Sequence, residues 1–298
     1  MIKKFAIEPA ALRRWEDFRY VTEKLGFSHG RVLAAFPKAW IKEFIEKQLV
    51  DAGEMERKRF IAKLQVIKQE RMVNSGVPYC GDVPWSENAL KHVNAFDRVI
   101  MADGSEECHR ESTVQSIDVI DEAFFEVARE VECESTPRGL ARPAEPLLSH
   151  ASEAAIVDPY FRVDINSCLS VLVALAKSAV AGRRFEQFYV YTSTKFLPRD
   201  RGRAARSEFG RIAEIAGLSG ARFEFRCVDP NRTEKAFHAR YLLTGEGGLR
   251  YDKGFQASHG KELVDVSLLD RTLHLRLRDI YIAAQRPRFV VESWSWDF

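Results

Sequence analysis

The chain has 298 residues, which is long enough for two domains or for one large domain with an appendage. With 46% hydrophobic and 30% charged residues, its composition is that of an ordinary globular protein and excludes a disordered or fibrous chain. A formal net charge of +2 is too small to indicate nucleic-acid binding from the total. Evidence for such binding must therefore come from local clusters of charge.

The five cysteines are scattered and never form a C-x-x-C pair, which argues against a disulfide framework and against a zinc knuckle. The first residues lack the apolar run of a signal peptide, and no stretch approaches the roughly 18 apolar residues of a membrane span. We therefore expect a cytoplasmic protein with reduced thiols, no membrane span, no metal and no cofactor.

Residues 9–74 repeat apolar side chains at three- and four-residue steps, the pattern of amphipathic helices. Helices are predicted from Leu12 to Leu25, over residues 31–36 after a Ser28 cap, from Pro37 to Leu49 and over residues 54–73. The many aromatic residues here are interpreted as core, with a docking face for a larger assembly as the alternative. We therefore predict a helical domain over residues 1–75.

The middle of the chain, residues 76–151, is predicted to be a helical and linker segment. Helices are predicted over residues 88–96, after a Ser86 cap, and over residues 117–131, where the apolar side chains are in phase. Three prolines then interrupt residues 132–146, which makes this run the candidate linker.

After Ser152 the pattern changes to alternating strands and helices. Strands are predicted over residues 154–157, 188–192, 222–228 and 289–294, helices over residues 168–181 and 204–216, and either element over residues 273–282. This alternation is typical of an α/β layer with a mostly parallel sheet. The predicted fold class is α/β, with an α/β domain over residues 152–298 preceded by an all-helical region.

The most informative motif of this half is His238-Ala239-Arg240, followed by a glycine-rich turn over residues 245–248 and a second short strand. Side chains alternate along a strand, so His238 and Arg240 are expected on the same face of a hairpin. An imidazole beside a guanidinium suits a phosphate group. A structural histidine bonded to the backbone is the alternative.

Residues 152–298 resemble the phospholipase D-like superfamily in its His-x-Arg variant. The resemblance rests on a strand ending in Asp158–Phe161, a strand ending in Thr192–Thr194 and the His-x-Arg hairpin. It implies a mixed sheet flanked by helices. In active members two His-x-Lys-x4-Asp motifs meet, one histidine attacks phosphorus, the other protonates the leaving oxygen, and the lysines hold the phosphate oxygens. By position, the resemblance implies that His238 is the nucleophile and Arg240 the phosphate clamp.

The chain departs from the family pattern in four ways. Arg240 replaces the lysine, Gly245 stands at the aspartate position, the Gly-Ser-x-x-Asn element that should follow is absent, and no second His-x-Lys occurs in the chain. Glu246, next to Gly245, becomes the candidate for orienting His238. The expected catalytic residues are therefore His238, Arg240 and Glu246, and an active enzyme would need a homodimer that brings two copies of His238 together.

The most basic segment, residues 195–206, follows the second predicted strand and should emerge at the same end of the sheet as Asp158. Clustered cations beside an aromatic side chain suit a polyanionic backbone, with a solvated loop as the alternative. Asp158 is expected either to orient Arg240 or to form an Asp-Pro turn. The expected substrate-binding residues are Asp158, Lys195, Arg199, Arg201, Arg203 and Asp252.

Two functions follow from these features. The first is a metal-independent phosphodiesterase or nuclease-like protein acting on a nucleic-acid backbone through the His-x-Arg site, by analogy a component of bacterial defence or mobile-element systems. The second is a catalytically inactive phospholipase D-like module that binds nucleic acid or a protein partner within a larger assembly. The missing second motif favours the module.

Overall fold

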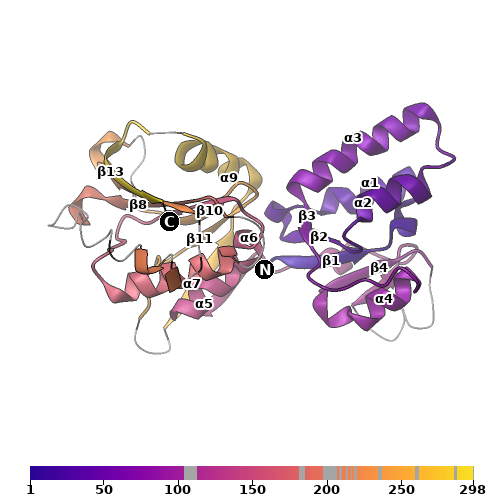
Figure 1. Ribbon diagram of the computed structural model, residues 1–298, viewed down its shortest axis with the longest axis horizontal. Coiled ribbons are helices and arrows are strands. Elements are labelled where there is room, and N and C mark those ends of the chain that lie inside the picture. Colours follow the sequence, from indigo (N-terminus) through magenta and orange to yellow (C-terminus); the bar gives the residue numbers. More distant parts are fainter. Residues whose placement is uncertain are drawn as a thin grey trace. The chain divides into compact units, whose positions relative to one another are not determined.

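The computed structural model describes residues 1–103, 113–180, 185–196, 207, 210–212, 214–215, 217, 220–233, 237–258, 262–284 and 287–297. The chain divides into two compact units, Met1–Ala128 and Arg129–Phe298, called the N-terminal unit and the C-terminal unit below. Each unit contains its own sheet (Figure 1). Among the helices of these described ranges, none is long and apolar enough to cross a membrane.

The N-terminal unit is built on a five-stranded sheet in the order β3-β2-β1-β4-β5, with every pairing parallel. In Figure 1, α1, α2 and α3 lie on one side of this sheet and α4 on the other. The strands are β1 (Lys3–Ile7), β2 (Arg31–Ala35), β3 (Met72–Asn74), β4 (Arg98–Met101) and β5 (Val114–Ser116). The helices include α1 (Trp15–Lys24), α2 (Trp40–Glu43), the π-helix η3 (Phe44–Gln48), α3 (Glu54–Glu70) and α4 (Trp85–Lys91).

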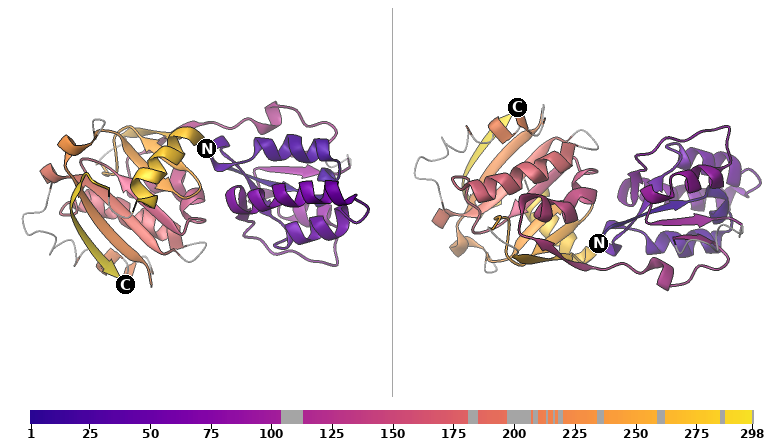
Figure 2. Two further views of the ribbon diagram at one scale, coloured as in Figure 1. Left: turned by 90° about the horizontal axis from the view of Figure 1, so that it is seen from above. Right: turned by 90° about the horizontal axis from the view of Figure 1, so that it is seen from below.

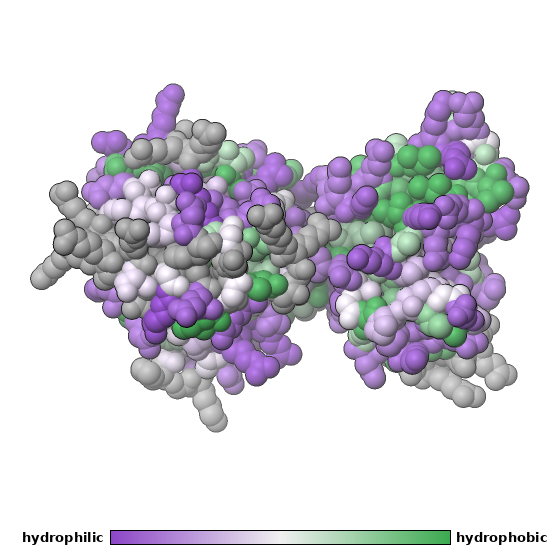
Figure 3. All heavy atoms as spheres, viewed as in Figure 1, coloured by the Kyte–Doolittle hydropathy of each residue, from purple (hydrophilic) through white to green (hydrophobic). Residues whose placement is uncertain are grey.

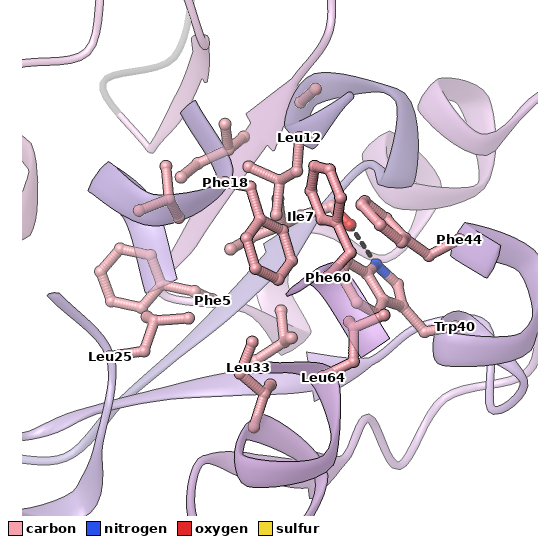
Figure 4. Close-up of a cluster of buried hydrophobic side chains, with 14 of the residues drawn as sticks. Phe5, Ile7, Leu12, Phe18, Leu25, Leu33, Trp40, Phe44, Phe60 and Leu64 are labelled. Carbon is pink, nitrogen blue, oxygen red and sulfur yellow. Dashed lines mark hydrogen bonds between the residues drawn. The ribbon is translucent and has the colours of Figure 1, made fainter. Parts of the chain in front are cut away.

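Successive residues of β1 face two different cores. Phe5 and Ile7 belong to an aromatic-rich cluster beneath α1, η3 and α3, whereas Ala6 belongs to a cluster on the opposite face. Figure 4 shows the first cluster, where the indole Nε1 of Trp40 donates a hydrogen bond to the carbonyl oxygen of Ile7 at 2.6 Å. The helices are thus fixed on both faces of one parallel sheet.

The prediction of an all-helical N-terminal region is wrong, because residues 1–75 contain β1, β2 and β3 of a parallel sheet that β4 and β5 complete. A strand buried on both faces is apolar throughout and lacks the alternation that identifies a half-buried strand. Residues 31–36, predicted as a helix, form β2, and the end of the predicted helix over 54–73 is β3. The predicted helix over 117–131 contains only the short 3-10 helix η6 (Ala123–Phe125) before a strand begins at Glu130.

The C-terminal unit contains an eight-stranded mixed sheet in the order β13-β9-β8-β7-β10-β11-β12-β6. β7, β8 and β9 are parallel to one another, and the remaining pairings are antiparallel. β13, yellow in Figure 2, forms one edge. The strands are β6 (Glu130–Glu134), β7 (Glu153–Val157), β8 (Gln187–Ser193), β9 (Arg222–Val228), β10 (Arg240–Thr244), β11 (Gly248–Tyr251), β12 (Leu263–Leu268) and β13 (Val290–Asp297).

Helices cover both faces of this sheet as well. In Figure 1, α5 and α7 lie on one side and α9 on the other. The elements are α5 (Pro137–Ala141), the 3-10 helix η7 (Arg142–Ala144), α6 (Glu145–Leu148), α7 (Asn166–Val180), α9 (Arg271–Arg278) and the π-helix η10 (Asp279–Ala283). Leu277 and Ile282 of the α9–η10 pair pack on Val157 and Tyr191 of the central strands.

Most elements predicted after Ser152 are present. Strands occur at 153–157, 187–193, 222–228 and 290–297, the helix at 166–180, and the hairpin at β10–β11, while residues 271–283 are helical. Much of the predicted helix over 204–216 falls outside the described residues.

The predicted linker over 132–146 is wrong. These residues form part of β6 and then α5, η7 and the start of α6. Each of the three prolines stands at the first or second position of a helical turn, where its missing N–H costs nothing. The boundary between the two compact units lies after Ala128 in the chain, whereas the sequence predicted boundaries near residues 75 and 151.

Candidate functional site

The ends of the parallel strands β7 and β8 and the start of β10 lie along one edge of the C-terminal sheet, the edge formed by strand ends and not by the outer strands β6 and β13. β7 ends at Val157 and β8 at Ser193, and β10 runs the opposite way, with Tyr241 paired to Val157. Asp158, Lys195 and Arg240 are therefore brought to the same edge, as expected for residues that follow parallel strands. Ligands of open α/β sheets bind outside such carboxyl ends.

Asp158 lies beneath this edge and is only 3% exposed. Its Oδ1 accepts a hydrogen bond from the backbone N–H of Tyr160 at 2.9 Å, and its Oδ2 accepts one from the backbone N–H of Phe255 at 3.0 Å. Burial raises the pKa of this carboxyl group, while the two backbone donors and the charge of Arg240 act against that rise. Asp158 thus joins the turn after β7 to the loop after β11.

Gly254 allows the loop after β11 to approach the side chains of Asp158 and Arg240 closely. Its φ is +89°, and a Cβ added there would lie 2.5 Å from Oδ2 of Asp158 and 3.3 Å from Nε of Arg240. No side chain fits without moving the carboxylate, and the backbone conformation itself favours glycine. The polar loop from Asp252 to Phe255 is therefore packed directly against the buried carboxylate and the guanidinium.

Within the described part of the chain, Arg240 is held by one hydrogen bond and one aromatic ring. Its Nη1 donates to the carbonyl oxygen of Asp252 at 2.6 Å, and its Cζ lies 5.0 Å from the ring centroid of Tyr160. Its Nε is buried and has no hydrogen-bond partner within the described part of the chain. Among the described residues, no carboxylate oxygen forms an ion pair with Arg240, although the charge of the buried Asp158 interacts with the guanidinium.

An aromatic surface and a second cation adjoin Arg240. The Tyr160 side chain is 44% exposed, and its ring centroid lies 5.7 Å from that of Phe196. Phe196 ends the 3-10 helix η8 (Thr194–Phe196), which also carries the exposed Lys195. The Thr192 hydroxyl donates to the carbonyl oxygens of Pro159 and Phe161 and fixes the turn that presents Tyr160.

His238 is exposed and precedes the strand, which begins at Arg240. The alternation of side chains along β10 therefore does not extend to His238. Glu246 follows the far end of β10, in the turn where its N–H donates to the hydroxyl of Thr244. A strand rises about 3.3 Å per residue, so Glu246 lies at the opposite edge and is too far away to orient His238.

The remaining predicted residues divide into two groups. Asp252 is at the site, but its contribution is the carbonyl oxygen that binds Arg240, while its Oδ1 accepts from the N–H of Asp265 at 3.1 Å. Arg199, Arg201 and Arg203 lie outside the described residues.

Two residues that complete the site, Tyr160 and Gly254, were not predicted as site residues. The available signals were an aromatic residue directly after a strand-ending Asp-Pro pair and a glycine in the polar loop after the hairpin. One buried titratable group, His274 on α9, is structural, because its imidazole Nε2 is bonded to the carbonyl oxygen of Thr244 at 2.9 Å. Burial lowers the pKa of this imidazole.

The N-terminal sheet has a corresponding edge, where the strand order reverses between β1 and β4. Glu8 bridges this point, because its Oε2 accepts a hydrogen bond from the N–H of Ala102 at 2.8 Å. Burial and the neighbouring Asp103 raise the pKa of the Glu8 carboxyl group. Within the described ranges, no group of three or more potential metal ligands is present in either unit.

Comparison with known proteins identifies no family for this chain. No family model matches the sequence, and no curated protein matches it. Among solved structures, the chain is similar to TrmBL2, described as an archaeal chromatin protein with a novel mode of DNA binding, at 13% identity and a TM-score of 0.28. The match covers 82% of this chain, which spans 66% of that protein. A likeness this distant supports no inference about fold or function.

Proposed function

We propose that the C-terminal unit binds the phosphate backbone of a single-stranded nucleic acid at the edge that carries Arg240. The observation behind this proposal is the guanidinium of Arg240, which forms no ion pair with a described residue and is held by the carbonyl of Asp252 and by the ring of Tyr160. Arginine presents N–H groups in a fork that matches phosphate oxygens. A guanidinium fixed before the ligand arrives loses little conformational entropy on binding.

The neighbours of Arg240 favour a nucleic acid over a free phosphate ion. Tyr160 and Phe196 form an accessible aromatic pair on which bases can stack, and Lys195 adds a second cation on the adjoining helical turn. Aromatic faces combined with cations are the usual means of binding single strands with little sequence preference. The ring over Arg240 then has two roles, positioning the cation and stacking a base.

A second candidate function is metal-independent hydrolysis of a phosphodiester. It is supported by the exposed position of His238, two residues before the phosphate clamp, and by the resemblance to the phospholipase D-like superfamily. In this reaction the imidazole nitrogen would attack phosphorus, the leaving oxygen would take a proton from a second acid, and water would then release the phosphohistidine. The second acid would be His238 of another copy of the chain.

Binding is tested with a fluorescein-labelled single-stranded oligonucleotide, followed by anisotropy with the full-length chain. Arg240→Met should weaken binding about tenfold or more, because one charge-assisted contact is lost. Arg250→Met is the matched control, since Arg250 is an exposed arginine on β11 of the same sheet. Equal losses in the two variants, or no binding by the unchanged protein, would refute the proposal.

Hydrolysis is tested separately with bis-p-nitrophenyl phosphate and the same oligonucleotide in the presence of a chelator. Turnover that disappears in His238→Ala would support the phosphodiesterase. Binding that persists in His238→Ala, without turnover by the unchanged protein, would support the binding module and reject hydrolysis.

A further inference from the structure

A pocket of about 440 Å³ opens on the helical side of the N-terminal unit. It is lined by the two residues before α2 and by residues of α2, η3, the last turn of α3 and the start of β3, all within the described part of the chain. Its volume lies within the range of about 300–1,000 Å³ that is typical of small-molecule sites. Neither candidate function of the C-terminal unit uses this pocket.

The pocket has an apolar floor. Ile41 and Ile45, one helical turn apart, and Met72 at the start of β3 are partly buried and pack against the aromatic core of the unit. All three residues line the pocket. Figure 3 shows apolar surface beside hydrophilic side chains over the helices of this unit. An aliphatic chain placed here would bury these side chains without needing hydrogen bonds.

The rim of the pocket is positively charged. Lys38, Lys42 and Lys68 line it and are exposed, and Glu46 is the one carboxylate among the lining residues. The Nζ of Lys42 lies 3.8 Å from Oε1 of Glu46. No described carboxylate lies within ion-pair distance of Lys38 or Lys68. The rim thus keeps an excess of positive charge around an apolar floor.

We propose that this pocket binds an aliphatic chain that ends in one anionic head group, as in a medium-chain carboxylate or its alkyl phosphate counterpart. The chain would lie on Ile41, Ile45 and Met72, where each buried methylene strengthens binding. The head would remain at the rim within reach of the three ammonium groups, where partial exposure avoids the cost of burying a charge. Charge complementarity excludes an alkyl ammonium ion.

The proposal is tested by titrating the full-length chain with octanoate, decanoate and dodecanoate below their micelle concentrations, using isothermal titration calorimetry. Affinity should rise about twofold to fourfold for each added methylene until the pocket is full. Decanoate and decyl phosphate should both bind, whereas the neutral octan-1-ol should bind at least fivefold more weakly than octanoate.

Variants locate the site. Lys42→Gln with Lys68→Gln should weaken decanoate binding about fivefold or more, while Ile45→Gln should reduce the dependence on chain length. Lys58→Gln is the matched control, because Lys58 is an exposed lysine of α3 outside the pocket, paired with Glu54 at 2.6 Å. The lysines are exposed, so these substitutions should leave the fold unchanged.

Several results would overturn the proposal. These are the absence of saturable binding, equal affinity for octanoate and octan-1-ol, and equal effects of the rim and control variants. Binding to anionic phospholipid vesicles without binding to monomeric decanoate would also refute it, and would identify the face as a membrane-contact surface instead.

Discussion

Two regions of the C-terminal unit hold an arginine in opposite ways. Arg226, on β9, is 2% exposed, and its Nε and Nη2 donate to the two carboxylate oxygens of Glu224 at 2.7 and 3.1 Å. Its Nη1 donates to the hydroxyl of Tyr191, which in turn donates to the carbonyl oxygen of Tyr281 at 2.6 Å. Arg240, on β10, has one carbonyl acceptor and one aromatic ring among the described residues.

Under the proposed function, the difference separates the structural cation Arg226 from Arg240, the cation that would bind the ligand. A charge buried as deeply as that of Arg226 is tolerated only when a carboxylate and further hydrogen bonds replace the lost water. Arg240 lies at the sheet edge, where solvent can compensate part of its charge until an anion arrives. The two arginines of one sheet therefore differ in the number of hydrogen-bond acceptors that surround each guanidinium.

The largest effect should come from removing the buried cation. Arg226→Met leaves the partly buried Glu224 without its partner and should lower the free energy of unfolding of the C-terminal unit by about 3–5 kcal/mol. Arg240→Met should cost less than about 1 kcal/mol, since among the described residues it removes one hydrogen bond to a carbonyl and no ion pair. Urea unfolding of both variants checks this, and similar losses would invalidate the distinction between the two arginines.

The next largest effect concerns the glycine behind Arg240. Gly254→Ala combines a disfavoured backbone conformation with a Cβ placed 2.5 Å from Asp158, so we expect a loss of about 2–4 kcal/mol and weaker oligonucleotide binding. Gly245→Ala is the matched control, because a Cβ at Gly245 meets no atom within 4 Å. Hydrogen exchange of the β10 amides measures the stability of both variants, and fluorescence anisotropy measures their oligonucleotide binding. If Gly254→Ala changed neither stability nor binding, the loop would not be packed as described.

A pH-dependent effect is expected at Asp158, whose pKa is raised by burial. The folded state then holds this proton more firmly than the unfolded state, so stability should fall as pH rises from the ordinary aspartate range through the raised folded-state pKa. The contribution is at most about 1.4 kcal/mol per pH unit. Asp158→Asn should lack this slope, although it loses one of two hydrogen bonds to backbone donors.

The difference between the two urea midpoints, measured from pH 4 to pH 8, isolates this group from all others. Parallel pH profiles for the unchanged protein and Asp158→Asn would contradict the assignment.

The smallest effect should come from the exposed Lys195. Lys195→Gln should weaken oligonucleotide binding about twofold to fivefold at physiological salt and reduce the slope of log K against log salt by about 0.7, the value for one contact with a single strand. Stability should be unchanged. Anisotropy titrations at four salt concentrations check this, and an unaltered slope would remove Lys195 from the phosphate path.

The two units differ in how far local sequence patterns predicted them. In the C-terminal unit, turn residues such as Asp158-Pro159 and the Gly245–Gly248 run bound each strand, and β7, β8, β9 and the hairpin were predicted correctly. In the N-terminal unit, β1 and β2 are short runs buried on both faces, which local periodicity cannot distinguish from helix. Strands as short as Met72–Asn74 exist only because neighbouring strands pair with them.

By itself, the sequence predicted that Asp158 and Lys195 would lie at the same end of a sheet, because residues that follow parallel strands meet there. Arg240 joins them because β10 pairs with β7 in the antiparallel direction. Only the tertiary structure decided what each residue does. The antiparallel course of β10 carries Glu246 to the far edge, and the approach of Gly254 leaves Asp158 bonded to backbone donors. Which acceptors lie near Arg240 depends on how the folded chain brings distant residues together, and local pattern carries no information about that.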